Sequence, residues 1–194
     1  MKDAILAIDV GTQSTRALAF TADGGLLDKA RAPHEPPYVS PELGWAEQDP
    51  AYFWDRVGTA CRRLWDQGVV APDRLAAVAM TFQRSTVVSL DAARRPLRPA
   101  IVWLDQRRAS RPPRLSAGWR AALTMAGASG VVDRFQAEAE ANWIAEHQPE
   151  VRRDTAHYLL LSGYVTLRMT GRACDSVACI VGYMPFDFRK LDWA

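Results

Sequence analysis

The stretch Asp9-Val10-Gly11-Thr12-Gln13-Ser14-Thr15-Arg16 decides how this chain folds. An apolar run, residues 4–8, precedes it, and a second apolar run, residues 17–20, follows it. The second run ends at Asp23-Gly24-Gly25, whose glycines can adopt the positive φ that a tight hairpin requires. The pattern therefore predicts a three-stranded antiparallel meander with strands over residues 4–9, 16–21 and 26–31.

The same stretch has the chemistry of a phosphate-binding loop. Glycine lets the main chain approach an anion closely, and successive N–H groups with hydroxyl side chains can surround phosphate oxygens. The carboxylate of Asp9, at the end of a strand, suits a hydrated Mg²⁺. An ordinary polar hairpin loop uses the same residue types, so the loop alone leaves both interpretations open.

The order of elements separates this loop from two other nucleotide sites. A Rossmann unit runs from strand to glycine loop to helix, whereas this glycine loop leads into another strand. A Walker loop ends in Gly-Lys-Ser/Thr, which is missing from this stretch. We therefore do not expect a dinucleotide site or a Walker-type site here.

Composition narrows the class of protein. The 194 residues suit one large domain, and 24 basic against 22 acidic residues give a net charge of only +2. We therefore expect no nucleic-acid or membrane partner. Three scattered cysteines favour a reducing cytoplasm, and no apolar stretch is as long as a membrane span. We interpret one local basic cluster as solvent-facing: Arg107, Arg108, Arg111 and Arg114.

The rest of the chain predicts a mixed-sheet α/β domain. A proline-rich loop, residues 33–48, precedes a helix that begins with Asp49 as N-cap and Pro50 in its first turn, and that ends at Gly68. Such a long loop is more often functional than accidental. We expect a buried strand over residues 75–82, further strands over 86–90 and 101–103, and helices over about 116–126, 137–147 and 162–169.

Several motifs, in order, resemble those of a known family. The Asp-x-Gly-Thr-x-Ser hairpin looks like the first phosphate loop of the ribonuclease-H-like, actin/hexokinase/Hsp70 ATPase-type fold. That fold has a mixed sheet, opened by a three-stranded antiparallel meander and flanked by helices. Four further segments resemble those of the FGGY carbohydrate kinases, in particular the glycerol-kinase-like members: Gly44-Trp45-Ala46-Glu47-Gln48-Asp49-Pro50, Gln83-Arg84-Ser85-Thr86, Trp103-Leu104-Asp105-Gln106-Arg107-Arg108, and Thr170-Gly171-Arg172 with Asp175.

The resemblance implies an activity and a domain organisation. Family members transfer the γ-phosphoryl group of ATP, with Mg²⁺, to a hydroxyl of a sugar or polyol. Residues 1–194 would form the amino-terminal domain, which carries the substrate site and the first phosphate loop. We expect this domain to be truncated at its C-terminal end and the second, adenosine-binding domain to be absent.

The resemblance also implies roles for individual residues. Asp9 would hold Mg²⁺ through water. Phosphate contacts would come from Gly11, Thr12, Gln13 and Ser14, with Arg16 as a nearby cation, although Arg16 could also be an ordinary strand-edge charge. Gln83 and Arg84 would bind substrate hydroxyls beside Ser85. Trp103 would form an apolar wall, although core packing would also explain it, and Phe135 would face the substrate.

Two departures from the family pattern qualify this picture. Glycerol kinases carry Glu where this chain has Ser85, and Tyr where it has Phe135, so we expect a polyol or sugar other than glycerol. The general-base Asp of the family lies in a Gly-Asp-Gln-like segment that we expect downstream of Ala194. No catalytic residue is therefore assigned in this chain, and we expect no kinase turnover from it alone.

Two other functions remain open. The chain could be a non-catalytic module that binds a sugar or a partner chain. It could also be a sugar-sensing regulator of the wider fold, although no helix-turn-helix pattern or basic stripe supports DNA binding. A homo-oligomer of the longer protein is left open.

Truncation of the domain at its C-terminal end would expose apolar surface that the rest of the domain normally covers. Residues 159–161 and 177–181 are candidates for this surface.

Overall fold

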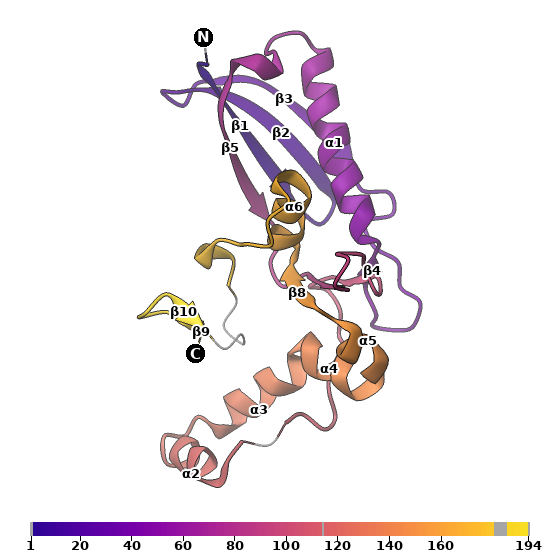
Figure 1. Ribbon diagram of the computed structural model, residues 1–194, viewed down its shortest axis with the longest axis vertical. Coiled ribbons are helices and arrows are strands. Elements are labelled where there is room, and N and C mark those ends of the chain that lie inside the picture. Colours follow the sequence, from indigo (N-terminus) through magenta and orange to yellow (C-terminus); the bar gives the residue numbers. More distant parts are fainter. Residues whose placement is uncertain (1, 114, 181–185, 194) are drawn as a thin grey trace.

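A computed structural model describes residues 2–113, 115–180 and 186–193. Figure 1 shows an elongated molecule with a sheet and a long helix, α1, at one end and the helices α2 and α3 at the other. A second, smaller sheet and helix α6 lie between these two ends.

The main sheet contains the predicted meander. Its strands are β1 (Ala4–Val10), β2 (Ser14–Thr21), β3 (Leu26–Pro33) and β5 (Leu75–Phe82), in the order β3-β2-β1-β5. The first three are antiparallel, whereas β5 runs parallel to β1, with Phe82 beside Val10. The hairpin glycine Gly24 has a φ of 91°. The sheet is thus mixed, and the expected actin-like α/β fold is confirmed.

Helix α1 (Pro50–Asp66) begins and ends where the sequence predicts. The Asp49 side chain accepts a hydrogen bond from the Ala51 N–H at 2.8 Å, and the helix is followed by Gly68 at a positive φ of 74°. Phe53 and Val57 are buried on its inner face. This helix covers one face of the meander.

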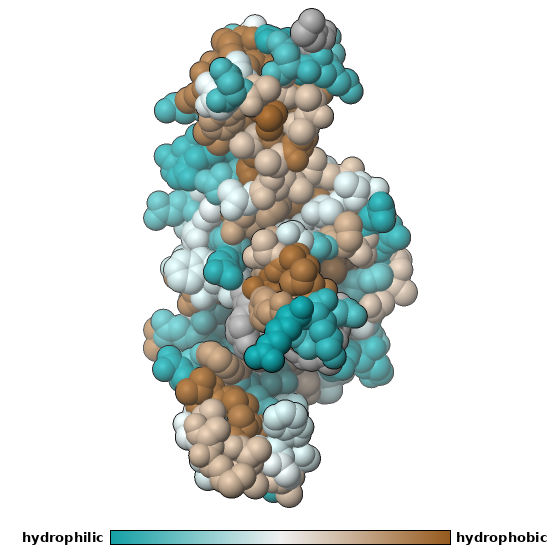
Figure 2. All heavy atoms as spheres, turned by 90° about the vertical axis from the view of Figure 1, so that its left-hand side faces the viewer, coloured by the Kyte–Doolittle hydropathy of each residue, from teal (hydrophilic) through white to brown (hydrophobic). Residues whose placement is uncertain are grey.

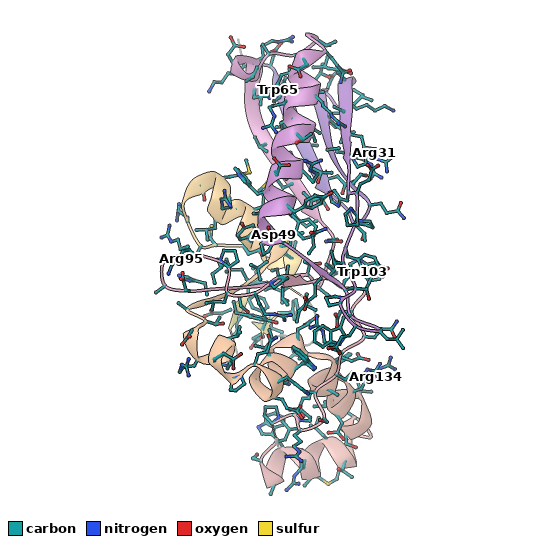
Figure 3. All side chains as sticks on the ribbon, turned by 90° about the vertical axis from the view of Figure 1, so that its right-hand side faces the viewer. Arg31, Asp49, Trp65, Arg95, Trp103 and Arg134 are labelled. Atoms are coloured by element: carbon teal, nitrogen blue, oxygen red, sulfur yellow. The ribbon has the colours of Figure 1, made fainter. Side chains whose placement is uncertain are left out.

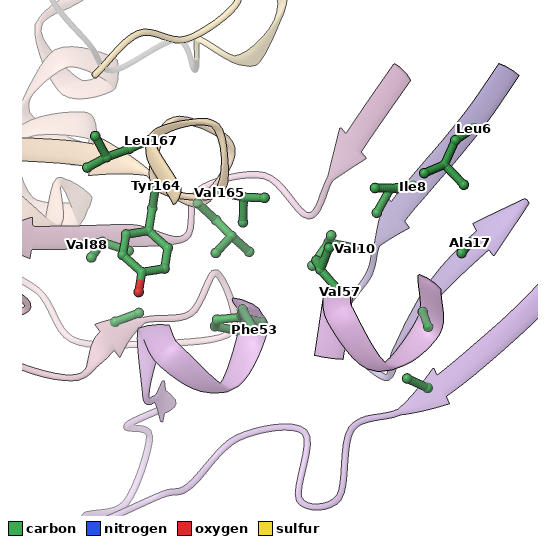
Figure 4. Packing of buried hydrophobic residues seen from close by; sticks show 14 of the residues in the cluster. Leu6, Ile8, Val10, Ala17, Phe53, Val57, Val88, Tyr164, Val165 and Leu167 are labelled. Atoms are coloured by element: carbon green, nitrogen blue, oxygen red, sulfur yellow. The ribbon is translucent and has the colours of Figure 1, made fainter. Parts of the chain in front are cut away.

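The core joins the two sheets through helix α6 (Leu161–Thr170). Figure 4 shows Tyr164 and Val165 of this helix near Phe53 of α1 and Val88 of the second sheet. The side chains of β1 alternate between buried and half-buried, as expected for a strand with one face on the core. Fully burying one such side chain stabilises the fold by about 1.5–3 kcal/mol.

The second sheet is antiparallel and was not expected as a separate sheet. Its strands are β4 (Glu47–Gln48), β7 (Ala100–Ile101), β6 (Val87–Leu90) and β8 (His157–Leu160), in the order β4-β7-β6-β8. The sequence predicts β6 and β7 but neither β8 nor β4, which falls within the loop expected over residues 33–48. A four-residue strand cannot be separated from the start of α6 by its apolar pattern.

Strand β5 corrects one expectation. It is a strand over the predicted residues, but residues 76–79 are exposed rather than buried. The cause is its position: one edge pairs with β1, and in the described part of the chain the other edge pairs with no strand. Figure 2 views the side of the molecule on which β5 lies, and apolar surface is visible over its upper part.

The candidate exposed residues 159–161 give the opposite correction. Leu160 and Leu161 are buried, with 7% and 1% of their surface exposed, because β8 and α6 pack into the two cores. In the second candidate segment, Val177 is exposed as expected, whereas Ile180 is buried. Val181 lies outside the described residues.

The remaining helices form the lower part of Figure 1. A single helix expected over residues 137–147 is instead divided at Ala139, whose backbone is extended, and residues 129–136 are also helical. No helix within the described residues is long and apolar enough to cross a membrane. The other elements are η1 (Pro72–Arg74), α2 (Ala117–Met125), α3 (Ser129–Glu138), α4 (Glu140–His147), α5 (Pro149–Asp154), η2 (Val177–Cys179), β9 (Phe186–Asp187) and β10 (Asp192–Trp193).

Candidate functional site

The loop between β1 and β2 forms one side of the candidate site. It is closed by a hydrogen bond from the Gly11 N–H to the Ser14 carbonyl at 3.0 Å. A Cβ added to Gly11 would lie 3.4 Å from that carbonyl oxygen, at the short end of ordinary van der Waals contact. Gly11 and Thr12 are half-buried, and Gln13 is exposed. The loop thus turns within three residues and leaves its main chain accessible from one side.

Ser14 differs from the rest of the predicted phosphate contacts. Its residue is 1% exposed, and its Oγ has no hydrogen-bond partner among the described atoms. A buried hydroxyl without a partner costs free energy, on the order of 1–3 kcal/mol. The Ser14 hydroxyl is therefore an unsatisfied donor directly beneath the loop.

Asp9 and Arg16 face each other across the β1–β2 ladder. The Arg16 Nη1 donates to the Asp9 Oδ2 at 2.6 Å, and both side chains are at least one-third exposed. Such a solvent-exposed pair contributes only about 0–1 kcal/mol. The carboxylate can therefore exchange this partner for another cation at little cost.

Asp9 also meets the ligand requirements of Mg²⁺ but not those of a protein-caged metal. Within the described ranges, no group of three or more His, Cys, Asp or Glu side chains could hold a metal ion. Mg²⁺ commonly uses one or two carboxylates and takes its other ligands from water and phosphate. A single half-buried carboxylate beside an anion-accessible glycine loop fits that ligand set.

The segment after β5 forms the opposite side of the site. The Gln83 N–H donates to the Val10 carbonyl at 2.8 Å, which places Gln83 and Arg84 beside the end of β1. The Gln83 amide nitrogen and oxygen are both buried and have no partner among the described residues. Arg84 is exposed. An unsatisfied amide and an exposed guanidinium at a strand end are groups that can bind a hydroxylated ligand.

Ser85 occupies an unusual backbone conformation. Its φ is 54°, in the left-handed region, which costs roughly 1–2 kcal/mol for a residue with a Cβ. Strain of this kind concentrates at ligand sites. Three depressions, of about 340, 450 and 480 Å³, all include Ser85 in their walls. Ser85, in the predicted substrate segment, therefore lies where these three depressions meet.

The depression of about 480 Å³ brings the two sides together. It contains most of the residues predicted from the sequence, whereas Gln13, Ser14 and Arg16 do not line it. Its volume lies in the range of small-molecule sites. Its walls are formed by Asp9, Gly11, Thr12, Phe82, Gln83, Arg84, Ser85 and Trp103.

Trp103 connects the two sides directly. Its ring is 50% exposed, so it is not a plain core residue. The indole Nε1 donates a hydrogen bond to the Thr12 Oγ1 at 2.8 Å. Figure 3 shows Trp103 between Asp49, at the start of α1, and Arg134 on α3. The apolar face of this ring is thus held at a defined place beside the β1–β2 loop.

Phe135 is not brought to this depression. It lies on α3 with 41% of its surface exposed and does not line the cavities of about 450 and 480 Å³. From this region, Glu138 at the end of α3 and Glu140 at the start of α4 line the neighbouring depression of about 450 Å³ instead. The geometry therefore leaves Phe135 apart from the other predicted substrate residues.

A buried ionic cluster beneath Trp103 was missed by the sequence reasoning. Arg107 was expected to face solvent, but only 4% of its side chain is exposed. It donates to Asp105 at 2.7 Å and to Glu47 at 2.8 Å, and its guanidinium carbon lies 4.1 and 4.5 Å from the ring centres of Trp45 and Trp143. The expectation holds for Arg108 and Arg111, which are exposed, and Arg114 lies outside the described residues.

The depression of about 340 Å³ lies behind Gln83 and Arg84. It also contains Ser162 and Cys179, and the Ser162 hydroxyl donates to Asp175. Burial raises the pKa of the Cys179 thiol, so this cysteine is a poor nucleophile. Asp175 is therefore a structural partner of α6 in this arrangement.

Fold and site together define a class of protein: an actin-like ATPase-type domain with a sugar-sized depression beside a phosphate-binding type of loop. Comparison with known families makes this specific. Residues 4–194 match the N-terminal domain of the FGGY family of carbohydrate kinases, and the chain belongs to that family.

Individual relatives agree with this assignment. A glycerol kinase from Gluconobacter oxydans is 34% identical over 175 residues, which are 88% of this chain and 34% of that protein. The structure of a gluconate kinase from Lactobacillus acidophilus superposes with a TM-score of 0.77 at 18% identity, covering 98% of this chain and 38% of that one. A Plasmodium falciparum glycerol kinase with ADP gives a TM-score of 0.68 at 23% identity, covering 98% and 39%. The chain thus spans little more than a third of these relatives.

Proposed function

We propose that this chain is the substrate- and phosphate-binding domain of a kinase that phosphorylates a hydroxyl of a sugar or polyol with ATP. One observation carries the proposal: the 480 Å³ depression joins the β1–β2 loop to the segment after β5 and to Trp103. A phosphoryl acceptor and the terminal phosphate of a donor must meet at one place, and this depression has groups suited to each.

The loop residues would hold the phosphates. Gly11 and Thr12 line the depression, and the Thr12 N–H and hydroxyl can donate to phosphate oxygens, whereas the Gly11 N–H is bonded to the Ser14 carbonyl and shapes the loop. Gln13, Ser14 and Arg16 would add donors at the rim of the loop or beneath it. Asp9 would hold Mg²⁺ through water, and the ion would neutralise charge that develops on the transferred group.

The opposite side would hold the acceptor. The unsatisfied amide of Gln83 and the guanidinium of Arg84 can donate to sugar hydroxyls, and Trp103 offers an apolar face to sugar carbons. Ser85 would leave space where a larger side chain would fill the junction of the depressions. Phe135 could contact the acceptor only after a movement of α3.

The chain alone would bind its sugar or polyol but would not catalyse phosphoryl transfer. Proton abstraction from the acceptor hydroxyl requires a general base, and we place that Asp, with the adenosine site, in a downstream part of a longer protein. We also place the longer protein in the cytoplasm, in agreement with the three free cysteines, and leave its self-association open.

The experiment compares this chain with the longer protein. Titration calorimetry of the chain against a panel of sugars and polyols should detect binding of at least one, while ADP release should require the longer protein. In the longer protein, Asp9→Asn should lower kcat at least about a hundredfold, since positioned charge stabilisation at a transition state typically contributes that much. Asp66→Asn, at an exposed carboxylate at the end of α1, is the matched control.

Two outcomes would overturn the proposal. Phosphorylation of a polyol by the 194-residue chain alone would show that the missing base is not needed. Sugar binding by a longer protein that never releases ADP would instead support a non-catalytic binding module.

A further inference from the structure

His34 contacts the β1–β2 loop but does not line the depression. It follows β3 directly and is 3% exposed. Three contacts join it to the loop: its main-chain N–H donates to the Gln13 carbonyl at 2.9 Å, its Nδ1 lies 3.0 Å from the Thr12 carbonyl oxygen, and its Nε2 lies 3.0 Å from the Thr15 Oγ1. One side chain thus contacts the loop at both ends.

The partners assign the position of the ring proton. A carbonyl oxygen can only accept a hydrogen bond, so the Nδ1 must carry the proton that it donates to Thr12. In a neutral ring the Nε2 then has a lone pair and accepts from the Thr15 hydroxyl. Both hydrogen bonds are therefore formed by the same neutral tautomer, and the other neutral tautomer would lose the bond to Thr12.

The surroundings favour the neutral ring. The rings of Tyr52 and Phe53, from α1, lie edge-on to His34 at 5.7 and 5.8 Å between ring centres. The charged groups that act on the imidazole are Arg56 of α1 and Arg31 of β3, and both are cations. Burial, together with these two cations, lowers the pKa of His34 below its usual range, although its bond to the Thr12 carbonyl acts in the opposite direction.

We propose that His34 is a positioning residue for the phosphate loop, which it fixes by joining Thr12 to Thr15 through the neutral Nδ1–H tautomer. Thr12 is then held on both sides, since Trp103 donates to its hydroxyl and His34 donates to its carbonyl. Thr12, which lines the depression, is thus restrained through both its side chain and its main chain. This inference deepens the proposed function, because the loop is the one proposed to hold the nucleotide phosphates.

The first test needs no variant and no activity. Long-range ¹H–¹⁵N correlation spectra of the 194-residue chain report the protonation of each ring nitrogen. We expect His34 to be protonated at Nδ1 only and to stay neutral as the pH falls through the ordinary histidine range. A ring protonated at Nε2 only, or one that titrates at or above the ordinary value, would overturn the proposal.

The second test uses His34→Gln, with His147→Gln as the matched control. His147 also places its Nδ1 near a main-chain carbonyl, that of Trp143 at 3.1 Å, but it lies on α4 away from the loop. The amide signals of residues 11–14 should shift in the first variant and not in the second. Unchanged signals in a folded His34→Gln variant would contradict a positioning role.

Kinetics of the longer protein separate positioning from general stability. His34→Gln should raise the KM for ATP about tenfold, roughly the effect of one net hydrogen bond, and should leave the KM for the sugar near its original value. Equal effects on both constants would indicate only a structural role and would refute the proposal. If the longer protein releases no ADP with any sugar, the proposed function fails, while the tautomer measurement on this chain still decides the role of His34.

Discussion

Removal of the buried guanidinium of Arg107 should destabilise this domain severely. Arg107 donates to both Asp105 and Glu47 and lies against the rings of Trp45 and Trp143. Arg107→Ala would leave two buried carboxylates without this partner and a gap between two indoles. Breaking a buried pair by removing one partner costs about 3–5 kcal/mol.

The expected value lies near the lower end of that range. Glu47 keeps a second cation, since Arg98 also donates to it, and Asp105 loses its cation but keeps two main-chain donors, the N–H groups of Ala46 and of residue 107. At roughly 2–4 °C per kcal/mol for a chain of this size, a loss of about 3 kcal/mol lowers Tm by roughly 6–12 °C. The neighbouring Arg108 is the control: it is 59% exposed and pairs with Glu138, so Arg108→Ala should cost at most about 1 kcal/mol.

Urea unfolding followed by tryptophan fluorescence measures both variants. The m-values should match that of the unchanged chain, so that a shift of the midpoint reports stability. If Arg107→Ala does not fold, Arg107→Lys retains the charge without the planar fork and should show an intermediate loss. Equal losses for Arg107→Ala and Arg108→Ala would refute the reasoning, because burial would then not distinguish the two arginines.

Four further outcomes are expected. In the longer protein, Ser85→Glu should shift kcat/KM towards glycerol relative to larger polyols, and a preference for glycerol before the change would contradict the substrate expectation. Phe53→Ala should lower the free energy of unfolding by about 3–5 kcal/mol in urea titration, since this side chain is fully buried between α1 and the sheet. Asp49→Ala should cost about 1 kcal/mol through loss of the N-cap, whereas Asp66→Ala, at the other end of the same helix, should not destabilise, as the same titration will show. Because the folded pKa of His34 is lowered, the unfolded chain takes up this proton first as the pH falls, so stability is lost below the ordinary histidine range. Unfolding midpoints at neutral and acidic pH should differ less in His34→Gln than in the unchanged chain.

Local sequence signals predicted the parts of the fold that depend on local chemistry. The glycine turn and the two apolar runs beside it placed the meander, and the Asp49–Pro50 cap placed α1. The β1–β2 loop was singled out by its local chemistry and residues 83–85 by the family resemblance, and both segments line the main depression. Each of these features is decided by residues close together in the chain.

What the sequence could not reveal depends on distant partners. The apolar sequence of β5 would be the same whether other elements covered the strand or not, so the exposure of its side chains was not predictable. Arg107 belongs to a basic cluster by sequence, yet Glu47, about sixty residues earlier, and Trp143 bury it. In the sequence, His34 belongs to no metal-binding or catalytic motif. Its only signal is position, directly after the strand that pairs with the end of the loop.

The bond between Trp103 and Thr12 also has a thermodynamic consequence. The bond couples Trp103, which forms one wall of the depression, to Thr12 of the β1–β2 loop on the other side. A ligand at Trp103 that strengthens or weakens this bond changes the affinity of the loop for its own ligand. Thermodynamic linkage requires the ligand at the loop to change the affinity at Trp103 by the same factor. Trp103→Phe keeps an aromatic wall but removes the donor, so it should reduce this reciprocity while leaving room for each ligand alone.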